Sequence, residues 1–186
     1  IRRFTQTYYA EGTKVLHMDD DVIDVLVKKS DKEMVPVASF EKDVIERGFN
    51  ALDENGANLF GIYAAANPMF MKNRTSVGLY YVIGSCWGMI HRHDPELSVT
   101  LDDKEDFERT LQHYVKDGKV VRLDDVTIKT KYYGTGGMQE ERTEKRIEES
   151  AKLLAARYPD LCSAYLREST GHWELRLRDK RPEEVP

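Results

Sequence analysis

The feature that most constrains the fold is an alternation of short apolar runs with amphipathic segments that end in glycine. Residues 13–18 (TKVLHM) predict a buried strand, and residues 22–29 predict a second strand or a short helix. A helix capped by Ser39 carries its apolar residues at helical spacing and ends at Gly56. Such an alternation of strands and helices predicts an α/β fold with a mixed sheet.

The rest of the chain continues this alternation. The remaining expected elements are a helix over 1–11, a polar connection over 28–36, strands over 59–68 and 75–93, a helix over 101–118, a β region over 119–133, a charged helix ending near Tyr158, and a strand pair over 161–168 and 172–178. No shift in composition divides the chain, so we expect one domain over 1–179 followed by a tail over 180–186.

Composition narrows the functional classes. With a formal net charge of -5, the chain is not a general nucleic-acid coat, although clustered basic residues still allow a nucleic-acid substrate. No apolar run is long enough to span a bilayer and no signal peptide is visible, so we expect an intracellular protein without a membrane. Cys86 and Cys162 form no CxxC pair, which argues against structural zinc and indicates reduced core thiols.

Three consecutive aspartates, Asp19, Asp20 and Asp21, directly follow the first apolar strand. Side chains at the carboxyl end of a central strand point into the crevice where α/β proteins bind ligands. Neighbouring carboxylates repel one another unless a cation lies among them, and hard oxygen ligands suit Mg²⁺ or Mn²⁺. In an extended segment Asp19 and Asp21 project to the same side, so we expect these two to share one ion. The alternative is a solvated acidic turn that caps the next segment.

This strand followed by DxD resembles the metal-binding and donor-binding motif of GT-A glycosyltransferases. The segment KEDFERTLQHYVKDGKVVRL is similar to the acidic helix, glycine turn and strand that follow the donor site in that fold. Together with ANPMFM, TSVGLYYVIGSCWGMI and TIKTKYYGTGGM, it resembles the TET-associated glycosyltransferase family over most of residues 1–150. The resemblance implies a GT-A-like mixed sheet flanked by helices. Because such enzymes begin with a nucleotide-binding βαβ region, we expect this chain to lack that N-terminal half.

The family resemblance also implies an activity and its partners. The expected enzyme is a hexosyltransferase that uses Mn²⁺ or Mg²⁺, takes a sugar from a UDP-sugar, and transfers it to a 5-hydroxymethylpyrimidine in DNA. The cell of a phage-infected host is one expected setting. Two alternatives remain open at this point: a degenerate GT-A module that only binds, and a metal-dependent nuclease or phosphotransferase built on the acidic cluster.

Individual residues receive expected roles. Asp106, with Glu105 beside it, is the expected general base; the alternative is that both carboxylates only favour the positive end of their helix, with Glu105 in a capping box with Asp102. The metal ligands are Asp19 and Asp21. The expected donor-binding residues are Asp20, Arg3, Gly84, Ser85, Trp87, Gly136 and Gly137. The expected acceptor-binding residues are Asn67, Arg142, Arg176 and Arg178.

Each of these assignments has a structural alternative. Gly84 to Trp87 also fit a β-bulge in a core strand, with the indole as packing. The glycines at 134–137 fit an ordinary flexible loop as well as a lid over the donor. The basic residues of the last strand also fit an edge strand protected by charge.

Overall fold

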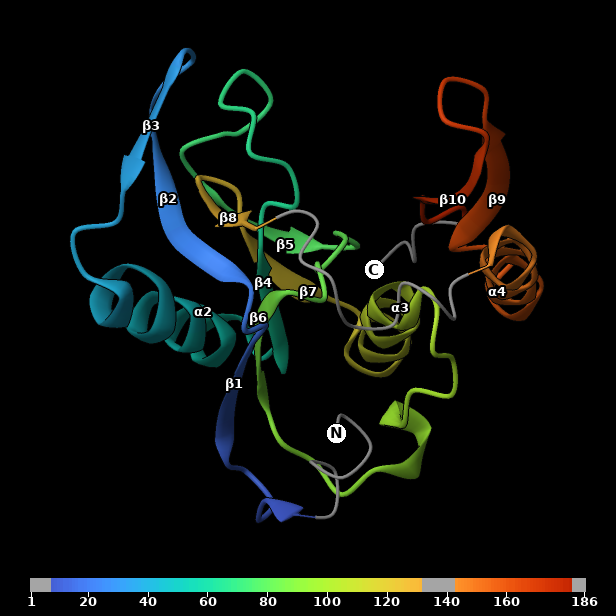
Figure 1. Cartoon of the computed structure of the whole chain (residues 1–186). Helices are drawn as coiled ribbons and strands as arrows, with labels where there is room; N and C mark the ends of the chain where they lie inside the picture. Colours follow the sequence, from blue (N-terminus) through green and yellow to red (C-terminus); the bar gives the residue numbers. More distant parts are fainter. Residues whose placement is uncertain (1–7, 132–142, 182–186) are drawn as a thin grey trace.

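The computed structural model describes residues 8–131 and 143–181, and it is a mixed α/β fold (Figure 1). Its largest sheet has the order β1-β6-β4-β7-β5. The strands are β1 (Lys14–Met18), β4 (Leu59–Ile62), β5 (Thr75–Gly78), β6 (Cys86–Ile90) and β7 (Val120–Leu123). Only β4 and β7 run parallel, and every other pair in this sheet is antiparallel, so the sheet is mixed.

Two smaller antiparallel sheets flank this one. The first has the order β3-β2-β8 and consists of β2 (Val22–Ser30), β3 (Glu33–Pro36) and β8 (Val126–Thr130). The second is a hairpin of β9 (Cys162–Arg167) and β10 (His172–Leu177). The α-helices are α2 (Arg47–Asn55), α3 (Glu105–Asp117) and α4 (Glu144–Arg157). A π-helical stretch (Glu41–Glu46) precedes α2, and a short 3₁₀ helix (Pro95–Leu97) precedes α3.

Helices α2 and α3 cover opposite faces of the central sheet (Figure 1). Adjacent residues of β4 show the division, because successive side chains of a strand point to opposite faces. Leu59 packs in the cluster that contains Phe107 and Leu111 of α3. Phe60 packs in the cluster that contains Leu52 of α2. Helix α4 and the β9–β10 hairpin extend the α3 side of this core.

The helical segment that contains α2 begins and ends as its sequence predicts. The Ser39 hydroxyl accepts a hydrogen bond from the Lys42 amide at 3.2 Å, and the Ser39 amide donates to the Asp43 carboxylate at 2.8 Å. This reciprocal arrangement satisfies amides that have no partner inside the helix. At the other end Gly56 has φ 59, the left-handed conformation that closes many helices.

Helix α3 begins differently from the sequence prediction. Neither Asp102 nor Asp103 caps it; its N-cap is Lys104, with φ 61 and no side-chain capping bond. Asp103 is instead buried and pairs with Arg146 of α4 at 3.3 Å. The acidic residues before α3 therefore attach α4, and Lys104 occupies the N-cap position that a capping box with Glu105 would give to Asp102.

A fully buried carboxylate strengthens the same junction. Glu108 of α3 accepts hydrogen bonds from the amides of Thr100 and Leu101 at 2.7 and 2.9 Å. It also accepts from the guanidinium of Arg157, at the end of α4, at 2.5 Å. Because all these partners bind one group, Glu108 joins α3, the segment before it and α4.

Several predicted boundaries need correction. The polar connection over 28–36 contains strand β3, which pairs with β2 through Val27 and Val35. The strand expected over 59–68 ends at Ile62. The strand before the aspartates is not central, because β1 lies at one end of the strand order among the described residues. The helix expected over 1–11 falls largely outside the described residues. Within the described part of the chain, no helix has the length and apolar character needed to cross a membrane.

Candidate functional site

The aspartate triplet forms the turn between β1 and β2. The Asp19 amide donates to the Ser85 carbonyl at 3.0 Å, and the Asp21 carbonyl accepts from the Lys131 amide at 2.9 Å. Asp19 is half-buried, whereas Asp20 and Asp21 are exposed. Because β1 pairs antiparallel with β6, Met18 lies opposite Cys86 and the turn lies beside the start of β6. The triplet therefore lies next to the expected donor-binding residues at 84–87.

Two stacked aromatic rings and a guanidinium group connect the strands beside this turn to α3. His17 and Trp87 are cross-strand partners, with ring centroids 4.0 Å apart and planes 10° apart. The guanidinium of Arg109, on α3, lies 3.9 Å from the centroid of Trp87 and forms an ion pair with Glu105 one helical turn earlier. Both long side chains of this ion pair are largely buried. Stacked between imidazole and guanidinium, Trp87 has no free ring face for a sugar, and its contribution is to position Arg109.

Tyr81 attaches the first turn of α3 from the other direction. Its hydroxyl donates a short hydrogen bond to Asp106, and its ring stacks on Phe107 with centroids 4.3 Å apart. The second Asp106 oxygen accepts from the Phe107 amide at 2.9 Å. The Thr110 hydroxyl accepts from the Val82 amide at 3.2 Å. The carboxylate of Asp106 is therefore held in a fixed orientation while remaining half-buried.

These contacts bring together residues that are far apart in the sequence. We call this set the acidic-turn site; it consists of Asp19, Asp20, Asp21, Tyr81, Gly84, Ser85, Trp87, Glu105, Asp106 and Arg109. Sequence reasoning did not identify Tyr81 and Arg109 as members. The spacing of Glu105 and Arg109, four residues apart on a helix, was an available signal for an ion pair but not for its burial.

The described residues limit how a metal ion can be held. Among them, no group of three or more histidine, cysteine, aspartate or glutamate side chains is arranged to bind one. Burial raises the pKa of the Cys86 thiol to about 12, with the charge of Asp19 adding to the effect, so no thiolate is available there. The carboxylates of Asp19 and Asp21 remain as the candidate ligands that the sequence predicts. This fits Mg²⁺ or Mn²⁺, which can bind through one or two carboxylates when substrate phosphates supply the remaining oxygens.

The expected acceptor-binding residues that are described lie outside this contact network. Asn67 is exposed in the loop after β4, and its side chain accepts from the Met69 amide at 3.1 Å. Arg176 is exposed on β10, with its guanidinium 5.1 Å from the Tyr165 ring. Arg178 follows β10, and its amide donates to the Leu161 carbonyl at 2.8 Å. Arg3, Gly136, Gly137 and Arg142 lie outside the described residues.

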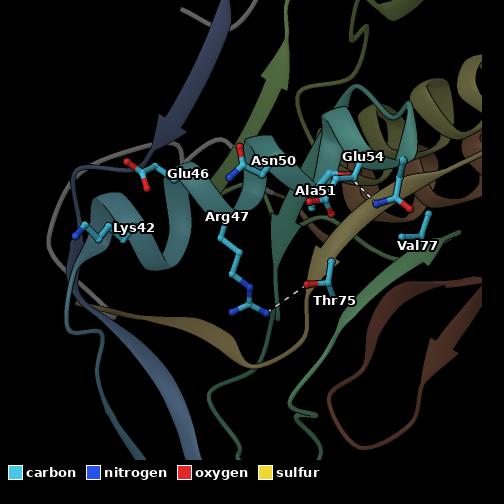
Figure 2. A pocket seen from close by; sticks show the side chains of 9 residues that line it. Lys42, Glu46, Arg47, Asn50, Ala51, Glu54, Thr75 and Val77 are labelled. Carbon is cyan, nitrogen blue, oxygen red and sulfur yellow. Dashed lines mark hydrogen bonds between the residues drawn. The ribbon is translucent and has the colours of Figure 1, made fainter.

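A separate pocket of about 470 Å³ lies between α2 and β5 (Figure 2). Arg47 crosses from α2 toward Thr75 on β5, with 3.3 Å between guanidinium and hydroxyl, and it pairs with both oxygens of Asp125 at 2.7 and 2.8 Å. The lining mixes both signs of charge and includes Lys42, Glu46, Asn50 and Glu54. No residue of the acidic-turn site lines this pocket, so we assign it no part in the chemistry.

Comparison of the chain with the models of known protein families, with curated proteins and with solved structures finds no match in any of the three. The functional assignment therefore depends on the contacts of the acidic-turn site and on the motifs quoted above.

Proposed function

We propose that this protein is a metal-dependent glycosyltransferase that moves a hexose from a UDP-sugar to a 5-hydroxymethylpyrimidine in DNA. The observation that carries the proposal is a chain of contacts that links two acidic groups separated by more than eighty residues. The turn at Asp19 hydrogen-bonds to Ser85, and the segment that includes Ser85 contacts α3 through Trp87 and Arg109. Arg109 in turn pairs with Glu105 in the first turn of that helix. A transferase needs both a place for the leaving diphosphate and a base for the acceptor hydroxyl.

Asp19 and Asp21 would hold a Mn²⁺ or Mg²⁺ ion together with the diphosphate of the donor. When bound, such an ion supplies Lewis-acid stabilisation of the negative charge on the leaving group. The half-buried Asp19 is fixed by the Ser85 carbonyl, whereas the exposed Asp20 faces solvent from which a donor can approach. One fixed and one solvent-facing carboxylate fit a metal site in which the donor diphosphate supplies the remaining ligands.

Asp106 is the better candidate for the general base. The Glu105 carboxylate is engaged by Arg109, and this pair is largely buried. Asp106 is oriented by the Tyr81 hydroxyl and the Phe107 amide yet stays half-buried. A carboxylate held in this way can accept the proton of the acceptor hydroxyl while the hydroxyl oxygen attacks the anomeric carbon of the sugar. The bond from that carbon to the diphosphate oxygen breaks in the same step, and the electron pair leaves with the diphosphate.

One observation favours a second candidate, a GT-A-like module that binds without catalysis. Both oxygens of Asp106 already accept hydrogen bonds within the chain, and Glu105 is paired as well. Such a module predicts no sugar transfer, and it predicts no Mn²⁺-dependent rise in melting temperature when a UDP-sugar is added.

The test is mass spectrometry of hydroxymethylated duplex DNA incubated with UDP-sugars and Mn²⁺. The wild type is expected to add one hexose mass to each modified base, and Asp19→Ala, Asp21→Ala and Asp106→Ala are expected to abolish that gain. Asp53→Ala is the matched control, because this exposed aspartate pairs with Lys14 away from the site. The absence of a gain with every donor rejects the proposed activity. An equal gain in the three variants rejects the proposed site.

A further inference from the structure

The loop between β4 and β5, residues 63–74, exposes two neighbouring apolar side chains. Met69 is 69% exposed and Phe70 is 63% exposed, whereas the next residue, Met71, is 1% exposed. Figure 1 shows this loop projecting from the central sheet beside the β2–β3 hairpin. A large apolar side chain in water carries an unfavourable hydration term, so a pair of them held outward indicates a surface that contacts a partner.

Hydrogen bonds hold this apolar tip in place. The Asn67 side chain accepts from the Met69 amide at 3.1 Å, and the Asn67 carbonyl accepts from the Phe70 amide at 3.2 Å. The ammonium of Lys28, on β2, donates to the Met71 carbonyl at 2.6 Å. Met71 is the buried apolar residue of this stretch, whereas Met69 and Phe70 are held outward. The tip is therefore preorganised for contact.

The loop that carries the tip has a positive charge of its own. Residues 63–74 contain Lys72 and Arg74 and no acidic residue, in a chain whose formal net charge is -5. Lys72 is exposed, and Arg74 keeps about half of its side chain in water although it pairs with Asp124 at 3.3 Å. The Lys72 amide donates to the Asp124 carbonyl at 3.2 Å, which fixes both cations beside the apolar tip. Two cations next to an apolar wedge complement the phosphates and the stacked bases of a nucleic acid.

We propose that Met69 and Phe70 insert between stacked bases of duplex DNA while Lys72 and Arg74 bind the flanking phosphates. The inference rests on the proposed function, because a base-modifying enzyme must reach an atom that stacking encloses. A membrane surface is the less suitable occupant, since two side chains offer little apolar area and stable attachment to lipid requires larger contributions.

The start of the loop that carries the tip is connected to the acidic-turn site through Arg122. The guanidinium of Arg122 lies 4.9 Å from the ring centroid of Tyr63, where the loop begins, and 4.8 Å from that of Tyr80. The next residue, Tyr81, donates to Asp106. The same sheet therefore carries the loop and the residue before Tyr81, which orients the proposed base.

The test measures DNA binding by fluorescence anisotropy, with a labelled duplex that contains one 5-hydroxymethylcytosine and with neither metal nor nucleotide sugar. The double variant Met69→Ala/Phe70→Ala is expected to bind about tenfold more weakly with an unchanged salt dependence, because stacking contacts release no counterions. Lys72→Ala is expected to reduce the slope of log affinity against log salt by about one. Val115→Ala, at an exposed apolar residue on α3, is the matched control and is expected to match the wild type.

A second readout places 2-aminopurine next to the modified base. The fluorescence of 2-aminopurine rises when it is no longer stacked on its neighbours. The wild type is expected to raise this signal and the double variant is not. Unchanged affinity and signal in the double variant would overturn the inference. A double variant that still binds DNA normally but no longer binds anionic vesicles would also overturn it. This binding assay contains no donor. DNA opening by a protein that transfers no sugar in the mass-spectrometry assay would therefore reject the proposed function alone. Sugar transfer by a double variant with normal affinity would reject the wedge alone.

Discussion

Gly88→Ala is predicted to destabilise the protein through a single aromatic ring. Gly88 of β6 lies opposite Phe60 of β4 in the sheet register. A β-carbon at position 88 would lie 2.2 Å from Cε1 and 2.6 Å from Cζ of that ring. The ring cannot retreat, because a β-carbon at Gly48 on α2 would also lie 2.4 Å from its Cε2 and Cζ. With the ring confined between two glycines, the added methyl should cost about 3 kcal/mol, the upper end for an overpacked core.

The magnitude can be checked by shortening the ring. Phe60→Leu removes the Cε and Cζ atoms that the new methyl would meet. Alone it should cost about 1–2 kcal/mol, since a leucine fills less of the cavity. In the Phe60→Leu background, Gly88→Ala should then cost less than about 1 kcal/mol. The expected coupling between the two changes is therefore about 2 kcal/mol.

Equilibrium unfolding in urea measures all four proteins of this cycle. Gly56→Ala is the control, because Gly56 has φ 59 and a β-carbon added there would meet no atom within 4 Å. Its cost of about 1 kcal/mol comes from the left-handed backbone and should be the same with either residue at position 60. Additive costs for Gly88→Ala and Phe60→Leu would refute the reasoning, as would a cost for Gly88→Ala below about 0.5 kcal/mol.

Three further predictions concern buried polar groups. Glu108→Ala should cost about 3–5 kcal/mol in urea unfolding, because it leaves Arg157 and two amides without their partner; a loss below about 1 kcal/mol would contradict this. Burial, with a contribution from the nearby Arg92, lowers the pKa of His113 from 6.5 to about 4. The unfolded state therefore binds the extra proton between those pH values, and stability should fall by about 3 kcal/mol as pH drops from 6.5 to 4. A His113→Gln variant should lack this part of the pH dependence. Burial raises the pKa of Cys86 to about 12 and that of Cys162 to about 11, so both thiols should react with a disulfide reagent at about pH 8 only as fast as the protein unfolds.

Local signals predicted the elements that local interactions determine. The closing glycines at positions 56 and 118 both adopt positive φ, and the two helices end there. The β9–β10 hairpin was predicted because apolar and polar residues alternate over 172–178, directly after a turn at Gly171. Strand β3 was missed because its charged surroundings resemble a loop. Strand β3 forms because it pairs with β2, and the strand propensities of its own residues do not predict such a pairing.

The carboxylates of the candidate site could be predicted from the sequence, but the side chains that contact them could not. The DDD run and the acidic start of α3 are visible as patterns of charge. The burial of Arg109 is not, because a charged residue on an amphipathic helix is ordinarily expected in water. Its position depends on Trp87 from a strand and on Glu105 one turn away. A glycine within a strand can mark a place where a ligand approaches the backbone, and at Gly88 the structure places the Phe60 ring instead.

The central claim is that the turn at Asp19 to Asp21 binds a diphosphate through a divalent metal ion. Calorimetric titration of the chain with UDP, in the presence and in the absence of Mn²⁺, tests this claim most directly. We expect binding that requires Mn²⁺ and that weakens at least about tenfold in Asp19→Asn and Asp21→Asn, because each variant loses a proposed ligand of the metal ion. Binding of equal strength without the metal, or in both variants, would contradict it.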